Sequence, residues 1–188
     1  AGAAMDTPFM DTVAAGLADA GIEVVRFEFP YMARRRVDGR RRPPDRADIL
    51  MATWRSVVGA LRDRPRLYVG GKSMGGRFAT MLAAEADGAP GLAGAVALGY
   101  PFHPPGKPEK TRVAHLAAMA TPTLVVQGER DSFGSRDEVA GYALSPRISL
   151  VWLPDGDHSF KPRKASGHTE AGNLDAAVAA MVSFINQD

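Results

Sequence analysis

Short apolar runs alternate with longer amphipathic runs along most of the chain, and this alternation constrains its fold more than any other feature. Short runs rich in β-branched and aromatic side chains, bounded by turn residues, predict buried strands. Longer runs in which apolar side chains recur every third or fourth residue predict helices. Strands are expected at residues 22–29, 67–70, 93–98, 123–127 and 148–153.

Helices are expected between these strands. The first begins after Thr7, a good N-cap, has Pro8 in its first turn and ends before Gly21. Further helices are expected near residues 78–82, 112–118, 136–143 and 173–185. The second helix, from about residue 48, has apolar residues spaced by 4, 3 and 4 positions at Leu50, Trp54, Val57 and Leu61.

Alternating strands and helices indicate βαβ units, whose right-handed crossovers give a mostly parallel sheet with helices on both faces. The predicted fold class is therefore a doubly wound α/β domain. Because 188 residues suit one core, residues 1–188 are expected to form a single domain. The chain opens in a Gly/Ala loop that leads into a helix, so one or more strands are expected to precede Ala1. Only residues 31–45 and 100–111 can overhang a site, so no large lid is expected.

The composition excludes several classes of function. Zero cysteines exclude disulfides, thiolate catalysis and cysteine-ligated metal sites, and suit a reducing cytoplasm. The 23 basic residues nearly balance 21 acidic ones, and a formal net charge of +2 does not indicate a nucleic-acid partner. No apolar run approaches the roughly 18 residues that a membrane span requires. We therefore expect a cytoplasmic protein without a membrane, nucleic-acid, cofactor or metal partner.

The loop after the 67–70 strand carries the first chemical signal. Its sequence GKSMG, at residues 71–75, matches the G-x-S-x-G nucleophile elbow between a strand and a helix. The glycines allow a sharp turn in which larger side chains would collide with the neighbouring strand and helix. A P-loop also ends in Gly-Lys-Ser, but it requires a glycine five residues before Gly71, where Arg66 stands. Ser73 is therefore the expected nucleophile.

A serine hydroxyl needs a base to accept its proton and an acid to orient that base. His158 follows the strand at residues 148–153 and is the expected base. Asp131 follows the strand at residues 123–127 and is the expected acid. The order Ser73, Asp131, His158 is the order found in chains with a G-x-S-x-G elbow.

Other polar residues near these three remain candidates. Glu129, Asp155 and Asp157 are alternative acids, although the last two are better explained as turn formers. His103 follows the strand at residues 93–98 and is the nearest rival to His158. The side chains expected to bind substrate are those of Lys72, His103 and Phe160.

Two basic segments each have two interpretations. Lys161, Arg163 and Lys164 follow the expected base and can either attract a carboxylate-bearing substrate or form a solvated loop. The arginines at residues 34–36 and 40–42 can either contact an acidic partner or lie in solvent. No aromatic interleaving or nucleic-acid motif supports a nucleic-acid interface.

Four segments carry a family resemblance: GGKSMGGR at residues 70–77, YPFHPPGKPEK at 100–110, QGERDSFG at 127–134 and LPDGDHSFKPRK at 153–164. Together they resemble the dienelactone-hydrolase-like part of the α/β-hydrolase superfamily. Within it, the chain is similar to the branch of bacterial hydrolase-like proteins, testis-expressed protein 30 and the third subunit of the NSL histone acetyltransferase complex. The resemblance implies a catalytic triad of Ser73, Asp131 and His158 and an esterase-like activity.

The resemblance also implies an N-terminal strand that ends in a His-Gly-Ala-Gly loop, whose backbone N–H groups help to bind the oxyanion formed during reaction. Ala1, Gly2 and Ala3 match the end of that loop. One oxyanion donor is expected from the N–H of Met74, directly after Ser73. The second is expected from Ala1 or Gly2.

The expected function is cleavage of an ester-like bond in a small molecule, whether a carboxylic ester, a lactone or a thioester. Perhydrolase activity on the same residues is a related possibility. The alternative from another class is a non-catalytic interaction module that keeps a hydrolase fold, because a fold does not by itself determine a function.

Overall fold

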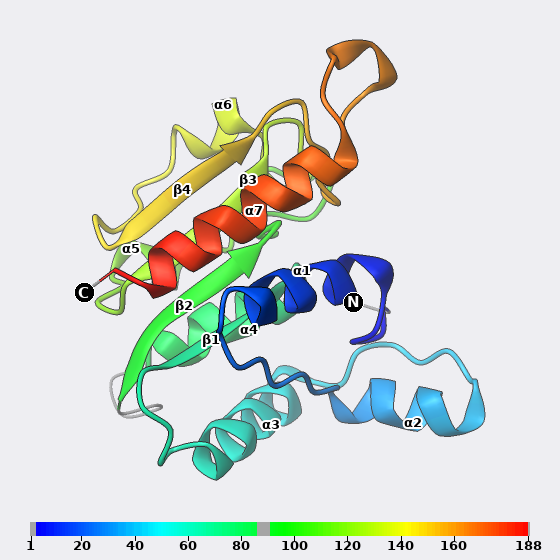
Figure 1. The fold of residues 1–188 in the computed structure, drawn as a ribbon, viewed down its shortest axis with the longest axis vertical. Helices are drawn as coiled ribbons and strands as arrows, with labels where there is room; N and C mark the ends of the chain where they lie inside the picture. The colour runs from blue at the N-terminus through cyan, green and yellow to red at the C-terminus, as the bar shows by residue number, and fades with distance from the viewer. Residues whose placement is uncertain (1–2, 86–90, 188) are drawn as a thin grey trace.

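A parallel sheet of four strands forms the centre of the structure, a computed structural model that describes residues 3–85 and 91–187 (Figure 1). The strands are β1 (Leu67–Lys72), β2 (Leu92–Leu98), β3 (Thr123–Gly128) and β4 (Ile148–Leu153). They lie in the order β1-β2-β3-β4, and each pair of neighbours is parallel. The carboxyl ends of all four strands therefore lie along one edge of the sheet, where ligands bind in such folds.

Helices connect and flank these strands. Between strands the chain passes through α4 (Met74–Ala83), α5 (Ala114–Ala117) and α6 (Arg136–Val139). Before the sheet it forms α1 (Pro8–Asp19), α2 (Pro30–Asp38) and α3 (Ala47–Ala60), and after it a 3-10 turn (Lys164–Ser166) and α7 (Glu170–Ile185). None of the helices in the described ranges has the length and apolar character needed to cross a membrane.

The helices cover both faces of the sheet, as the alternation in the sequence predicts (Figure 1). Successive side chains of a strand point to opposite faces, so β2 and β3 supply both halves of the core. The residues that pack with α3 and α4 are Ala95, Ala97 and Val125. The residues that pack with α1 and α7 are Val96, Leu98, Leu124 and Val126.

Helix α1 begins and packs in accordance with its sequence. Thr7 is its N-cap, with a side chain that accepts a hydrogen bond from Met10 N at 3.5 Å, and Pro8 stands in the first turn. The helix contacts α7 at Gly16, where an added Cβ would lie 2.7 Å from Cγ1 of Val178. A glycine is therefore needed there for the two helices to approach so closely.

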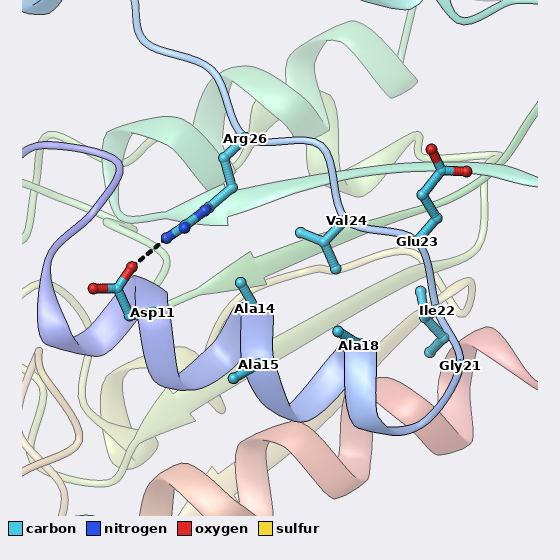
Figure 2. A pocket seen from close by; sticks show the side chains of 9 residues that line it. All are labelled: Asp11, Ala14, Ala15, Ala18, Gly21, Ile22, Glu23, Val24 and Arg26. Carbon is cyan, nitrogen blue, oxygen red and sulfur yellow. Dashed lines mark hydrogen bonds and ion pairs between the residues drawn. The ribbon is translucent and has the colours of Figure 1, made fainter.

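The expected strand at residues 22–29 is not formed, because this segment pairs with no strand of the sheet. Figure 2 shows it passing along α1. Side chains of both segments line a hollow of about 640 Å³. Val24 is 36% exposed and Val25 is 53% exposed, so these side chains contribute little to the core. The β-branched composition predicted the strand, but a strand also needs a hydrogen-bonded neighbour, and β1 does not provide one to this segment.

Helix α2 occupies the start of the arginine-rich segment, for which the sequence analysis predicted no helix. Pro30 stands in its first turn, and Gly39, with a φ of 71°, ends it in the left-handed conformation that favours glycine. Arg36 pairs with Asp6 at 2.9 Å and with Glu28 at 2.7 Å. Part of the positive charge of this segment is therefore balanced within the domain.

Candidate active site

Ser73 stands in the tight turn between β1 and α4. Its φ of 54° and ψ of −116° lie in a region that residues other than glycine rarely adopt, at a cost of about 1–3 kcal/mol. The turn is held by a hydrogen bond from Ser73 N to Leu98 O of β2 at 2.8 Å. This conformation places the serine at the carboxyl edge of the sheet, between the last residue of β1 and the first of α4.

Gly71 of the motif and Gly76, which follows it, allow α4 to pack directly against the sheet. A Cβ on Gly76 would lie 2.5 Å from Gly71 O and 3.0 Å from the Cα of Ala97. A Cβ on Gly71 would lie 3.0 Å from the carbonyl carbon of Gly75. Both positions therefore require glycine. The steric argument made from the sequence holds for Gly71 but not for Gly75, where an added Cβ would meet no atom within 4 Å.

His158 lies in the loop after β4 and bridges Ser73 and Asp131. Its Nε2 is 2.8 Å from Ser73 Oγ, and its Nδ1 is 2.8 Å from Asp131 Oδ2. Phe133 packs against the imidazole, with ring centroids 4.2 Å apart and planes inclined by 30°. The imidazole side chain is 23% exposed, whereas Asp131 is 0% exposed. The structure thus brings together the three side chains that the sequence analysis selected.

Asp131 follows β3, and its carboxylate accepts two hydrogen bonds besides the one from His158. Gln127 Nε2 donates to Oδ2 at 2.8 Å, and Phe133 N donates to Oδ1 at 2.8 Å. An ionised carboxylate only accepts hydrogen bonds, so His158 Nδ1 must carry the proton. His158 Nε2 is then free to accept the hydroxyl proton of Ser73.

Gln127 is a site residue that the sequence analysis missed. It is 0% exposed, and besides Asp131 its Nε2 donates to Tyr100 O at 3.2 Å and Gly134 O at 3.1 Å. Its Oε1 accepts a hydrogen bond from Tyr100 N at 2.7 Å. The available signal was one amide side chain directly after the apolar run of the strand TLVVQG, four residues before Asp131.

With this geometry established, comparison with known proteins assigns the family. A model of the alpha/beta hydrolase domain matches residues 1–186. The chain belongs to the alpha/beta hydrolase family. The comparison with curated proteins gives no match.

Solved structures of other hydrolases share the fold. A serine hydrolase homologue from Coxiella burnetii gives a TM-score of 0.68 at 19% identity, over 97% of this chain and 78% of that chain. A serine hydrolase without lid from Xanthomonas campestris gives 0.66 at 23% identity, over 96% of this chain and 74% of that chain. Est1E from Butyrivibrio proteoclasticus gives a TM-score of 0.66 at 15% identity, over 98% of this chain and 85% of that chain.

The other acidic residues near the site of this hydrolase shape the loop that carries His158. Asp155 accepts hydrogen bonds from Arg163 N at 2.6 Å and Arg163 Nε at 2.8 Å, and the bonded guanidinium lowers the pKa of Asp155 to about 2. Glu129 accepts from Asp155 N at 3.0 Å. Asp157 accepts from two backbone N–H groups of its own loop, at 2.7 and 3.0 Å. Each of these carboxylates is thus engaged in the loop structure rather than at His158.

Each of the side chains expected to bind substrate has a contact within the protein. Phe160 is 0% exposed and packs on Phe9 of α1, with ring centroids 5.2 Å apart. His103 is 2% exposed and bonds through Nδ1 to Pro104 O at 2.9 Å. Lys72 Nζ donates to the backbone O of His158 at 2.7 Å. Core packing or a hydrogen bond within the protein thus engages each of these three residues, and their contact with substrate stays a prediction.

Two expected oxyanion donors, Ala1 and Gly2, lie outside the described residues. Met74 is the first residue of α4, where a helix leaves backbone N–H groups without an intrahelical acceptor. Its N–H stands directly after Ser73, at the end of the helix whose dipole favours negative charge. In the described part of the hydrolase, no group of three or more His, Asp or Glu side chains is arranged to hold a metal ion.

Proposed function

We propose that this member of the family is a serine hydrolase that cleaves an ester-like bond through a triad of Ser73, His158 and Asp131. The observation that carries the proposal is the unbroken line of hydrogen bonds from the serine through the imidazole to a buried carboxylate, both at 2.8 Å. A hydroxyl in contact with an oriented, neutral imidazole is an activated nucleophile.

The first half of the proposed reaction forms an acyl-enzyme. His158 Nε2 takes the proton of Ser73 as Oγ bonds to the carbonyl carbon of the substrate, and the carbonyl oxygen becomes an oxyanion. The N–H of Met74 donates to this oxyanion. Asp131 stays ionised and stabilises the imidazolium without taking its proton. The imidazolium then protonates the leaving oxygen or sulfur, which departs.

The second half releases the acid. His158 takes a proton from water as the water oxygen bonds to the acyl carbon, and a second oxyanion forms at the same donor. When it collapses, the bond to Ser73 Oγ breaks and His158 returns the proton to the serine. One ester and one water give one acid and one alcohol or thiol, and the enzyme is regenerated.

A small carboxylic ester, lactone or thioester is the proposed substrate class. Two observations support it: His158 retains access to solvent, with 23% of its side chain exposed, and the four sequence segments named above resemble the dienelactone-hydrolase-like branch. Arg163, earlier a candidate for attracting acidic substrates, pairs with Asp155 instead. Arg163 therefore gives no reason to expect a negative charge on the substrate.

Turnover of short-chain p-nitrophenyl esters tests the proposal. Wild-type protein is expected to release p-nitrophenol, and Ser73→Ala to lose all turnover above the uncatalysed rate. Ser56→Ala, which changes an exposed serine of α3, is the matched control and should retain full activity. Equal turnover by Ser73→Ala would exclude Ser73 as the nucleophile. An inactive wild-type protein across esters, lactones and thioesters would favour the non-catalytic interaction module.

A further inference from the structure

Lys72, the residue before Ser73, makes a contact that the proposed reaction does not use. It ends β1, and its ammonium lies 4.3 Å from the ring centroid of Phe9 and 5.6 Å from that of Phe160. From this position Nζ donates a hydrogen bond of 2.7 Å to the backbone carbonyl of His158. The side chain that neighbours the nucleophile in sequence thus contacts the base in space.

A charged group in this place needs an explanation. Removing an ammonium from water is unfavourable unless hydrogen bonds or aromatic faces compensate for it. An unbranched apolar side chain such as methionine would fill the space between two phenylalanine rings without that cost. What lysine adds is a directed donor, and it is directed at the main chain of His158.

The bond connects two segments that the sheet keeps apart. Lys72 belongs to β1 and His158 follows β4, and these strands lie at opposite ends of the order β1-β2-β3-β4. Gly99, with a φ of 61°, lies behind the same carbonyl: a Cβ there would be 3.0 Å from His158 O. The carbonyl is therefore fixed by a donor and by close packing, and the imidazole extends from that fixed backbone.

We propose that Lys72 is a positioning residue that holds the backbone of His158 so that the imidazole stays within hydrogen-bonding distance of Ser73. This rests on the proposed function for its catalytic consequence, whereas the positioning itself is a property of the fold. Misplacement of a catalytic group by about 1 Å costs on the order of 10²-fold in rate. Without the bond, kcat should fall by about 10- to 100-fold while KM changes little.

Lys72→Met tests this inference, with Lys72→Arg as the conservative variant and Lys110→Met, at an exposed lysine, as the matched control. The readouts are kcat and KM for a p-nitrophenyl ester and the NMR resonance of the proton that His158 Nδ1 shares with Asp131. Lys72→Met is expected to lower kcat and to shift or broaden this resonance. Lys72→Arg should keep much of the wild-type kcat and a resonance close to that of the wild type. Lys110→Met should change neither kcat nor the resonance.

A second measurement avoids any folding defect of the variant. Burial lowers the pKa of Lys72 from 10.5 to about 8, an effect that Asp131 and Asp157 oppose. The charged and titratable groups around Nζ are these two carboxylates and His158. Raising the pH of the wild-type protein from 7 to 9.5 weakens the bond to the carbonyl by removing the charge. The resonance should change more over this range in the wild type than in Lys72→Arg, where the charge is kept.

The outcomes separate the inference from the proposed function. An active wild type with unchanged kcat and resonance in Lys72→Met would overturn the positioning role and leave the hydrolase intact. If the wild type is inactive but its resonance changes with pH and differs from that of Lys72→Met, the positioning role is supported and the proposed function is contradicted. A resonance insensitive to both the substitution and pH overturns the inference whatever the activity.

Discussion

At the scale of the residue, the site depends on how the buried carboxylate of Asp131 is held. Asp131 is removed from water and receives hydrogen bonds from a backbone N–H, from Gln127 and from His158. Hydrogen bonds to an ionised group are stronger than those between neutral groups. They also fix both carboxylate oxygens, so the imidazole can take one orientation. Gln127 is important because it links Asp131 to the chain at Tyr100 and Gly134.

Gln127→Leu should impair both stability and activity. The change leaves the buried N–H of Tyr100 without an acceptor, which costs about 1–3 kcal/mol. It also removes one donor from Asp131, so kcat should fall more than KM rises. Urea unfolding and steady-state kinetics measure the two effects. Gln187→Leu, at an exposed glutamine, is the control; an active and fully stable Gln127→Leu would contradict the role of the Gln127 side chain.

The lowered pKa of Lys72 also predicts how the free energy of unfolding depends on pH. The pKa of its ammonium is about 8 in the folded protein and 10.5 ordinarily, so between these values the unfolded chain binds more protons. The free energy of unfolding must then rise with pH across this window, by up to about 3 kcal/mol relative to Lys72→Met. Urea unfolding of the wild type and of Lys72→Met, each at pH 7.5 and pH 10, measures how the difference between their free energies of unfolding changes with pH. A difference that stays constant, or falls, would contradict the buried position of the ammonium.

At the scale of the element, the turn between β1 and α4 combines a strained serine with glycines that permit close packing. Gly76→Ala should separate α4 from the sheet, because the new Cβ would meet Gly71 O and the backbone of Ala97. A loss of about 1–3 kcal/mol in the free energy of unfolding is expected, with a large loss of activity. Thermal unfolding and ester turnover measure both.

Gly59→Ala is the matched control for that change. Gly59 lies in α3 with no atom within 4 Å of an added Cβ, and alanine is the better helix former. This variant should be as stable as the wild type or more stable by up to about 1 kcal/mol. If both glycine variants behaved alike, the close approach at Gly76 would not be the cause.

The sequence predicted these elements well where local rules determine them. The four strands of the sheet are short apolar runs closed by turn residues, and Thr7 with Pro8 correctly marked the start of α1. The segment at residues 22–29 has the same composition, yet pairing depends on a neighbour that local sequence does not specify. Helix α2 was missed because its arginines give no apolar periodicity, whereas ion pairs such as that of Arg36 with Glu28 hold it.

At the scale of the whole molecule, the site exists because parallel strands end at one edge. Ser73 follows β1, Asp131 follows β3 and His158 follows β4. The sequence indicated this convergence, since each candidate followed a predicted strand. It did not indicate which nearby side chains are buried, as those of His103 and Phe160 are. Burial depends on packing between distant segments, such as that of Phe160 on Phe9.

The most direct test of the central claim is covalent labelling with a fluorophosphonate, mapped by mass spectrometry of the digested protein. We predict a single adduct on Ser73, formed about 10²–10⁴ times more slowly in His158→Ala. His168→Ala, which changes an exposed histidine, should label at the wild-type rate. An adduct at another residue, or an undiminished rate in His158→Ala, would contradict the account.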